Sequence, residues 1–235
     1  SIEDARACFG AMLDGAGTDE EIAAFLLALS ERDEQAEEIA GAAQAMRERM
    51  IRVSAPDNAI DVCGTGGDGQ HTLNVSTAVA LVVAACGVPV AKHGNRAASS
   101  KAGGADTLEA LGVNLTIAPE VAEAQLNDLG ICFLFAQNHH PGLKRLGPIR
   151  KALGKRTIFN LLGPLANPAG VKRQLLGIAR PDYVPVYAQA LRLLGTERAM
   201  IVSGDEGLDE LSIAGTSRFA SIGFDLGHDI IAPEG

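Results

Sequence analysis

The 235-residue sequence lacks an apolar run of the roughly 20 residues that a membrane-crossing helix needs. It also lacks a basic surplus: 20 Lys and Arg against 29 Asp and Glu give a net charge of −9, which argues against binding to nucleic-acid phosphates. Its four cysteines are scattered, without C-x-x-C spacing and with no signal peptide ahead of them. We therefore expect no disulfide framework or zinc site, no membrane partner and a cytoplasmic location.

The hydrophobic content of 47% is enough for a full core, and the patterning divides the chain into two parts. Residues 1–53 have helical periodicity, with Thr18 and Glu21 forming a capping pair, and predict an N-terminal helical subdomain. Residues 54–235 alternate short β-rich runs with helical stretches, which predicts a mainly parallel sheet flanked by helices, an α/β fold. The expected strands are Ala59–Val62, Val88–Ala91, Cys132–Phe135, Gln174–Ile178 and Ala199–Val202.

A glycine-rich segment, residues 61–77, follows the first expected strand. Gly64, Gly66 and Gly67 crowd Asp68, and polar residues come where the next helix would begin. Glycines let backbone N–H groups approach an anion closely, and a helix N-terminus favours negative charge. The pattern is neither G-x-x-x-x-G-K-S/T nor G-x-G-x-x-G, so it predicts a phosphorylated ligand other than the usual nucleotides. A tight turn capped by Asp68 is the structural alternative.

A second polar cluster, residues 90–106, follows the next expected strand. It contains three cations, two hydroxyls and three glycines. A solvated loop turning at Gly94 would account for the polarity but not for a position after a buried strand, where α/β proteins bind their ligands. Both clusters are expected at one edge of the sheet, so that a single ligand could contact both.

With these motifs, the strings RTIFNLLGPLANP at 156–168 and GLDELS at 207–212 complete a pattern that resembles the anthranilate phosphoribosyltransferases of tryptophan biosynthesis. The resemblance runs in order along nearly the whole chain and implies a nucleoside phosphorylase/phosphoribosyltransferase-like fold. Members of this family continue further, so we expect a chain truncated at its C-terminus. Pyrimidine nucleoside phosphorylases have a related basic loop and are the nearest rival; a non-catalytic nucleic-acid binder is a second.

The resemblance implies transfer of the phosphoribosyl group from phosphoribosyl pyrophosphate to the amine of anthranilate, with Mg²⁺ as cofactor and a homodimer formed through the N-terminal helices. It implies catalysis by positioning and electrostatics, with no catalytic side chain. The metal ligands implied are Ser76, Asp209 and Glu210, and those of anthranilate are Gly64, Asn95 and Arg150. The residues implied for phosphoribosyl pyrophosphate are Gly64, Gly67, Asp68, Thr72, Asn74, Val75, Ser76, Thr77, Lys92, His93, Gly94, Asn95, Arg96, Ser99, Ser100 and Gly104.

Several of these residues have a plain structural interpretation. Asp209 and Glu210 alone would read as a solvated loop, and Arg150 as a surface residue of its helix. Gly104 departs from the family, where many members have serine, so any contact there is expected from the backbone. His139 and His140 are expected in a polar loop or at a pocket entrance, since no carboxylate stands at metal-ligand spacing from them.

Overall fold

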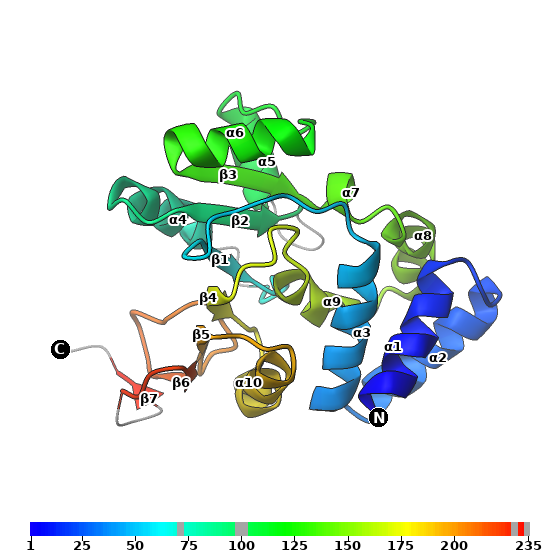
Figure 1. The fold of residues 1–235 in the computed structure, drawn as a ribbon. Coiled ribbons are helices and arrows are strands. Elements are labelled where there is room, and N and C mark those ends of the chain that lie inside the picture. Colours follow the sequence, from blue (N-terminus) through cyan, green and yellow to red (C-terminus); the bar gives the residue numbers. More distant parts are fainter. Residues whose placement is uncertain (70–72, 97–102, 227–229, 233–235) are drawn as a thin grey trace.

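The computed structural model describes residues 1–69, 73–96, 103–226 and 230–232. Its N-terminal part consists of α1 (Ile2–Leu13), α2 (Asp19–Glu31) and α3 (Ala36–Arg49), which lie beside an α/β part (Figure 1). Thr18 and Glu21 form the capping box expected at the start of α2, with each side chain bound to the other residue's backbone N–H. The helical pattern of this region is thus confirmed.

Close packing of α1 on α3 depends on small residues. Ala40, Ala42 and Ala43 of α3 are fully buried. At Gly41 between them, an added Cβ would lie 2.5 Å from the carbonyl oxygen of Ile2. A side chain at this position would therefore separate the two helices.

The described residues of the α/β part form a seven-stranded sheet with the order β3-β2-β1-β4-β5-β6-β7. Strands β1 to β5 are parallel, whereas β6 and β7 continue the sheet in antiparallel pairing. Their bounds are Ile60–Gly64, Val90–Gly94, Ile131–Phe135, Arg173–Gly177, Arg198–Gly204, Ser217–Ile222 and Ile230–Ile231. The mainly parallel sheet is confirmed, and its five expected strands are found with shifts of up to three residues at their ends, whereas β6 and β7 were not expected.

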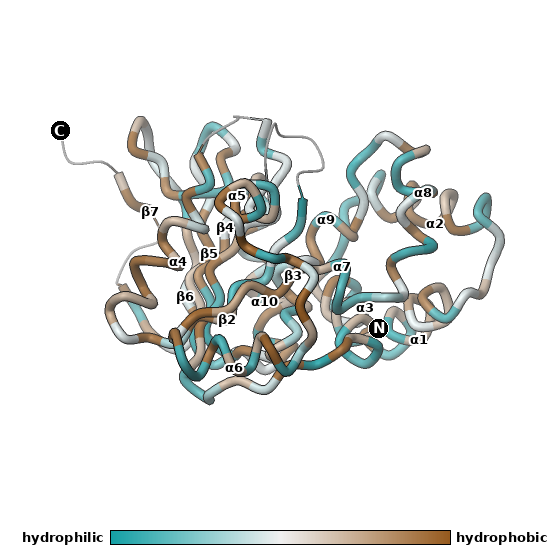
Figure 2. The backbone as a smooth tube through the Cα atoms, turned by 90° about the horizontal axis from the view of Figure 1, so that it is seen from above, coloured by the Kyte–Doolittle hydropathy of each residue, from teal (hydrophilic) through white to brown (hydrophobic). Residues whose placement is uncertain are grey.

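Helices cover the sheet and connect its strands (Figure 1). They are α4 (Val75–Ala85), α5 (Gly104–Ala110), α6 (Pro119–Leu129), α7 (Ala136–His139), α8 (Leu143–Leu153), α9 (Phe159–Leu162) and α10 (Val184–Leu193), with 3₁₀ turns at Gly163–Leu165 and Pro181–Tyr183. Hydrophobic residues predominate in α4 and β3, whereas α8 is mixed (Figure 2). No helix among these described elements is long and apolar enough to cross a membrane.

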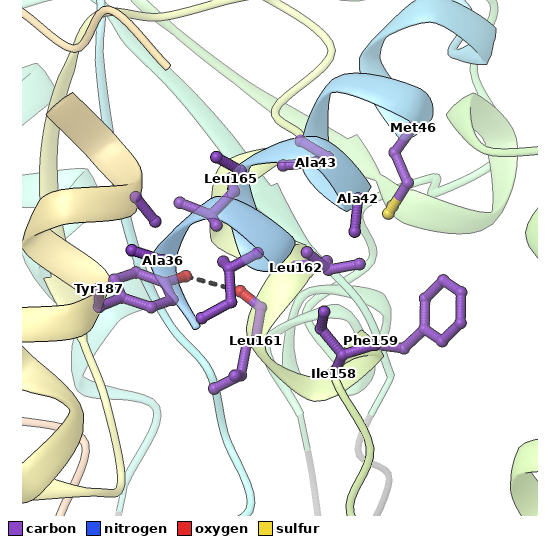
Figure 3. Packing of buried hydrophobic residues seen from close by; sticks show 14 of the residues in the cluster. Ala36, Ala42, Ala43, Met46, Ile158, Phe159, Leu161, Leu162, Leu165 and Tyr187 are labelled. Atoms are coloured by element: carbon purple, nitrogen blue, oxygen red, sulfur yellow. Dashed lines mark hydrogen bonds between the residues drawn. The ribbon is translucent and has the colours of Figure 1, made fainter. Parts of the chain in front are cut away.

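One hydrophobic core joins the two parts of the chain. Ala36, Ala42 and Ala43 of α3 pack in the same cluster as Leu162 of α9 and Tyr187 of α10 (Figure 3). The buried Tyr187 hydroxyl donates a hydrogen bond to the carbonyl oxygen of Leu161 at 2.7 Å. The division into residues 1–53 and 54–235 stays a prediction. The N-terminal helices share a hydrophobic core with the α/β part.

Candidate active site

A cleft of about 310 Å³ lies at the carboxyl ends of β1 and β2. The described residues that were predicted to bind a ligand all line this cleft, except Thr77. Thr72, Ser99 and Ser100 fall outside the described residues. The cleft therefore brings together Gly64, Gly67, Asp68, Asn74, Val75, Ser76, Lys92, His93, Gly94, Asn95, Arg96, Gly104, Arg150, Asp209 and Glu210. Their individual roles stay predictions.

The glycine-rich loop begins where β1 ends. Gly66 and Gly67 have φ values of +66° and +74°, in the left-handed region that glycine adopts without strain. The backbone N–H of Gly66 donates to a carboxylate oxygen of Asp209 at 2.7 Å. At Gly64, an added Cβ would lie 2.2 Å from the same carboxylate. The loop thus holds the Asp209 side chain across the cleft.

The acidic pair is more buried than a solvated loop would be. Asp209 is 9% exposed, and burial raises the pKa of its carboxyl group. Burial, followed by the nearby charge of Asp209, raises the pKa of Glu210 to about 7, although the Ser76 backbone N–H donates to its carboxylate. Adjacent buried carboxylates destabilise each other's charged forms. A cation between them would remove that cost.

The oxygen donors present fit Mg²⁺. The described residues contain no cluster of three His, Cys, Asp or Glu side chains suited to a metal. The set of Ser76, Asp209 and Glu210 instead offers hard oxygen atoms, and Mg²⁺ typically uses one or two carboxylates together with substrate phosphates.

The basic loop presents two cations with different environments. Lys92 is 5% exposed, and its ammonium donates to the Val62 carbonyl oxygen at 2.7 Å and to the Ser76 hydroxyl at 3.2 Å. Arg96 is 41% exposed, and its guanidinium forms ion pairs with Glu109 at 2.7 Å and Asp106 at 3.0 Å. These carboxylates compete with any anion for Arg96, whereas Lys92 is fixed beside the cleft.

Two buried imidazoles face each other at the cleft. The rings of His93 and His140 are 5.2 Å apart, and burial lowers their pKa values to about 3 and about 4. His93 Nδ1 donates to the Gly163 carbonyl oxygen at 2.9 Å, which leaves Nε2 as an acceptor. His139 is also buried but bonds to the Ile51 carbonyl oxygen, and only His140 of the adjacent pair lines the cleft.

Arg150 lies in the last turn of α8 and also lines the cleft. Burial lowers the pKa of its guanidinium, which stacks 5.4 Å from the centre of the Phe159 ring. Within the described part of the chain, no carboxylate forms an ion pair with it. A half-buried guanidinium beside an aromatic wall suits a planar aromatic acid.

Thr77 lies behind the cleft wall and packs against Gly104, which lines the cleft. The Thr77 hydroxyl is buried and would lie 3.1 Å from a Cβ at Gly104. Glycine at position 104 therefore leaves room for the first turn of α4.

Sequence reasoning missed several residues that line the cleft, including Met46, Phe133, Phe159, Asn160 and Gly163. Phe159 and Asn160 belong to the RTIFN string, which was used as a family signal without a role for each residue. Met46 belongs to α3, and nothing local to it indicated a ligand site. Gly177 was also missed: its Cβ would lie 1.6 Å from the Asp209 carbonyl oxygen.

Comparison with known proteins agrees with this geometry. Residues 1–50 match the helical bundle domain of a glycosyl transferase family, and residues 56–227 match its a/b domain. The chain is 71% identical to the anthranilate phosphoribosyltransferase of Novosphingobium aromaticivorans over 93% of its own length and 66% of that relative. It thus spans about 66% of the length of this relative.

Solved structures give the same result. The anthranilate phosphoribosyltransferase of Thermus thermophilus superposes with a TM-score of 0.91 at 45% identity, over 99% of this chain and 69% of that one. The Saccharomyces cerevisiae enzyme in complex with PRPP and Mg gives a TM-score of 0.84 at 34% identity, over 93% and 65%. The chain belongs to the anthranilate phosphoribosyltransferase family of glycosyl transferases.

Proposed function

We propose that this chain forms the site at which the phosphoribosyl group of phosphoribosyl pyrophosphate is transferred to the amine of anthranilate, with release of pyrophosphate. The observation that carries the proposal is the composition of a single cleft. Hydrogen-bond donors suited to phosphate line it, together with the acidic pair Asp209 and Glu210 and the guanidinium of Arg150. A relative of the same fold is known in complex with PRPP and Mg.

In the proposed reaction, the anthranilate nitrogen forms a bond to C1′ as the C1′–oxygen bond breaks. Pyrophosphate leaves with the electron pair, and the proton lost by the nitrogen is taken up by the released pyrophosphate. The backbone N–H groups of the glycine-rich loop and the Lys92 ammonium would stabilise the departing charge. Arg150 would orient the anthranilate carboxylate so that the amine faces C1′. The neutral imidazoles of His93 and His140 would provide acceptors beside that amine.

Ser76, Asp209 and Glu210 are the residues that would hold Mg²⁺. Bound there, the ion would neutralise pyrophosphate charge as it develops. We expect Ser76→Ala, and the double change Asp209→Asn with Glu210→Gln, to weaken magnesium-dependent use of phosphoribosyl pyrophosphate more than anthranilate binding. Magnesium titrations of both variants check this, and an unchanged requirement would remove the metal assignment.

The activity itself is tested by the loss of anthranilate fluorescence when phosphoribosyl pyrophosphate and Mg²⁺ are added. The Novosphingobium relative serves as a positive control. Phosphorolysis of thymidine by the chain would instead favour the nucleoside phosphorylase alternative.

Self-association through α1–α3 stays a prediction. In residues 1–50 every Leu, Ile, Met and Phe side chain is buried or half-buried, because the apolar faces of these helices pack into the shared core. Light scattering at high micromolar concentration tests the dimer, and a monomer would contradict it.

A further inference from the structure

The two strands that carry both ligand-binding loops leave regular ladder pairing soon after they meet. In the described sheet, β1 and β4 keep register over five residue pairs, whereas β1 and β2 do so at Ile60 and Val90 alone. The Ile60 backbone N–H still donates to the Pro89 carbonyl oxygen at 2.9 Å. In a regular parallel ladder, the next bonds would join Val62 to Ala91 and His93.

Side chains occupy the places of those missing bonds. The Val62 carbonyl oxygen accepts from the Lys92 ammonium at 2.7 Å. The His93 backbone N–H donates to Asp61 Oδ1 at 3.1 Å, and the Ala91 carbonyl oxygen accepts from Asn167 Nδ2 at 2.8 Å. Three of the backbone groups of the interrupted ladder, the Val62 and Ala91 carbonyl oxygens and the His93 N–H, thus have a side-chain partner.

Asp61 is the centre of this arrangement. Its side chain is fully buried, and its Oδ2 accepts from Asn167 Nδ2 at 2.8 Å and from the Cys63 thiol at 3.4 Å. Complete burial raises the pKa of this carboxyl group, and the Lys92 charge together with the amide, backbone and thiol donors opposes that rise. Lys92 provides the opposite charge in the same gap.

Asn167 belongs to neither strand and bridges Asp61 of β1 and Ala91 of β2, where the ladder between the two strands is interrupted. Its amide nitrogen is shared between Asp61 and the Ala91 carbonyl oxygen, and its Oδ1 accepts from the Ala169 backbone N–H at 2.8 Å. Asn167 is therefore bound on both sides, and it cannot rotate without leaving buried polar groups unsatisfied.

We infer that Asp61 and Asn167 are positioning residues that hold β1 and β2 apart and thereby place the Lys92 ammonium against Ser76 at the pyrophosphate end of the cleft. An ammonium has three donors, and among the described residues Val62 and Ser76 accept two of them, so the third is available to an anion. The effect on catalysis rests on the proposed function, whereas the placement of Lys92 rests on the structure alone.

The test compares Asp61→Asn with Tyr187→Phe, which removes a buried hydrogen bond outside the gap. We expect Asp61→Asn to weaken binding of magnesium pyrophosphate, measured by calorimetry, at least tenfold. Its KM for phosphoribosyl pyrophosphate should rise while that for anthranilate changes little. Tyr187→Phe should lower the unfolding midpoint and leave pyrophosphate affinity within twofold. Wild-type affinity in Asp61→Asn, or an equal loss in both variants, would overturn the inference.

A second measurement separates this inference from the proposed function. Amide hydrogen exchange at His93, followed by NMR, should be at least tenfold faster in Asp61→Asn and in Asn167→Ser than in the wild type. It needs no ligand, and Asn167→Ser replaces Asp61→Asn if the latter does not fold. Failure of the wild type to bind pyrophosphate would count against the proposed function, whereas unchanged exchange at His93 would count against the positioning role.

Discussion

At the scale of single residues, Arg150 makes the sharpest distinction between the two proposed substrates. A partly buried guanidinium–carboxylate contact contributes about 1.5–3 kcal/mol, so Arg150→Ala should raise the anthranilate KM roughly ten- to a hundredfold. Arg150→Lys should recover part of the loss, because lysine cannot form the planar two-point contact. Steady-state kinetics should show little change in the KM for phosphoribosyl pyrophosphate. Equal effects on both substrates, or none, would rule out the assignment.

Position 177 has no room for a side chain because the loop that carries Asp209 lies against it. A Cβ there would overlap the Asp209 carbonyl oxygen, so Gly177→Ala must displace the Asp209 backbone. We expect the magnesium dependence of pyrophosphate binding to be lost, as calorimetry with and without Mg²⁺ can measure. Gly147→Ala is the matched control, because nothing lies within 4 Å of its Cβ. Retained magnesium dependence in Gly177→Ala would show that Asp209 is not a ligand.

The residue-level roles that could be predicted are those with local chemistry. Gly66 and Lys92 are indicated by their residue types and by their positions after an expected strand, whereas Glu210 was assigned through the family resemblance because alone it would read as part of a solvated loop. Asp61 is not indicated by either, because its partners come from residues 93 and 167 and meet only in the folded chain. Met46 is similar: an apolar residue in an amphipathic helix is usually a core residue, and its place at the cleft depends on how α3 packs.

At the scale of elements, α5 controls the charge available to the basic loop. Its residues Asp106 and Glu109 hold the Arg96 guanidinium in ion pairs. If Arg96 also binds pyrophosphate, Glu109→Gln should strengthen that binding by about two- to fivefold, as expected for release from a surface pair. Calorimetry against Glu120→Gln, an equal charge change on α6, checks this. The same affinity in both variants would remove Arg96 from the anion site.

Strands differed in how well their sequences revealed them. The five parallel strands are short apolar runs between helical stretches, the pattern of strands covered on both faces. Strand β6 contains Ser217, Arg218 and Ser221 and lies towards the edge, where one-sided burial weakens the signal. Strand β7 has two residues and is defined by pairing with β6, which no local pattern can predict.

At the scale of the whole molecule, the buried histidines make stability depend on pH. Burial lowers the pKa values of His93 and His140 below the ordinary 6.5, so the unfolded chain binds more protons between about pH 6.5 and 4. The histidines' contribution to stability should therefore fall as the pH drops through this window, by up to roughly 1.4 kcal/mol per pH unit for each histidine, whereas the raised pKa of Glu210 acts in the opposite direction. Urea unfolding at pH 7 and pH 5 should show a smaller drop for His140→Gln than for the wild type. An identical drop would mean that His140 becomes protonated in the folded protein.

The shared core brings the N-terminal helices to the wall of the cleft. Met46 forms part of the cleft, while Gly41 on the same helix allows α1 to approach within contact distance. A rigid helix transmits a displacement along its length, so a bulky residue at position 41 would alter the cleft wall at Met46. A substitution in the helical bundle, although far from the glycine-rich loop, should therefore change the shape of the cleft.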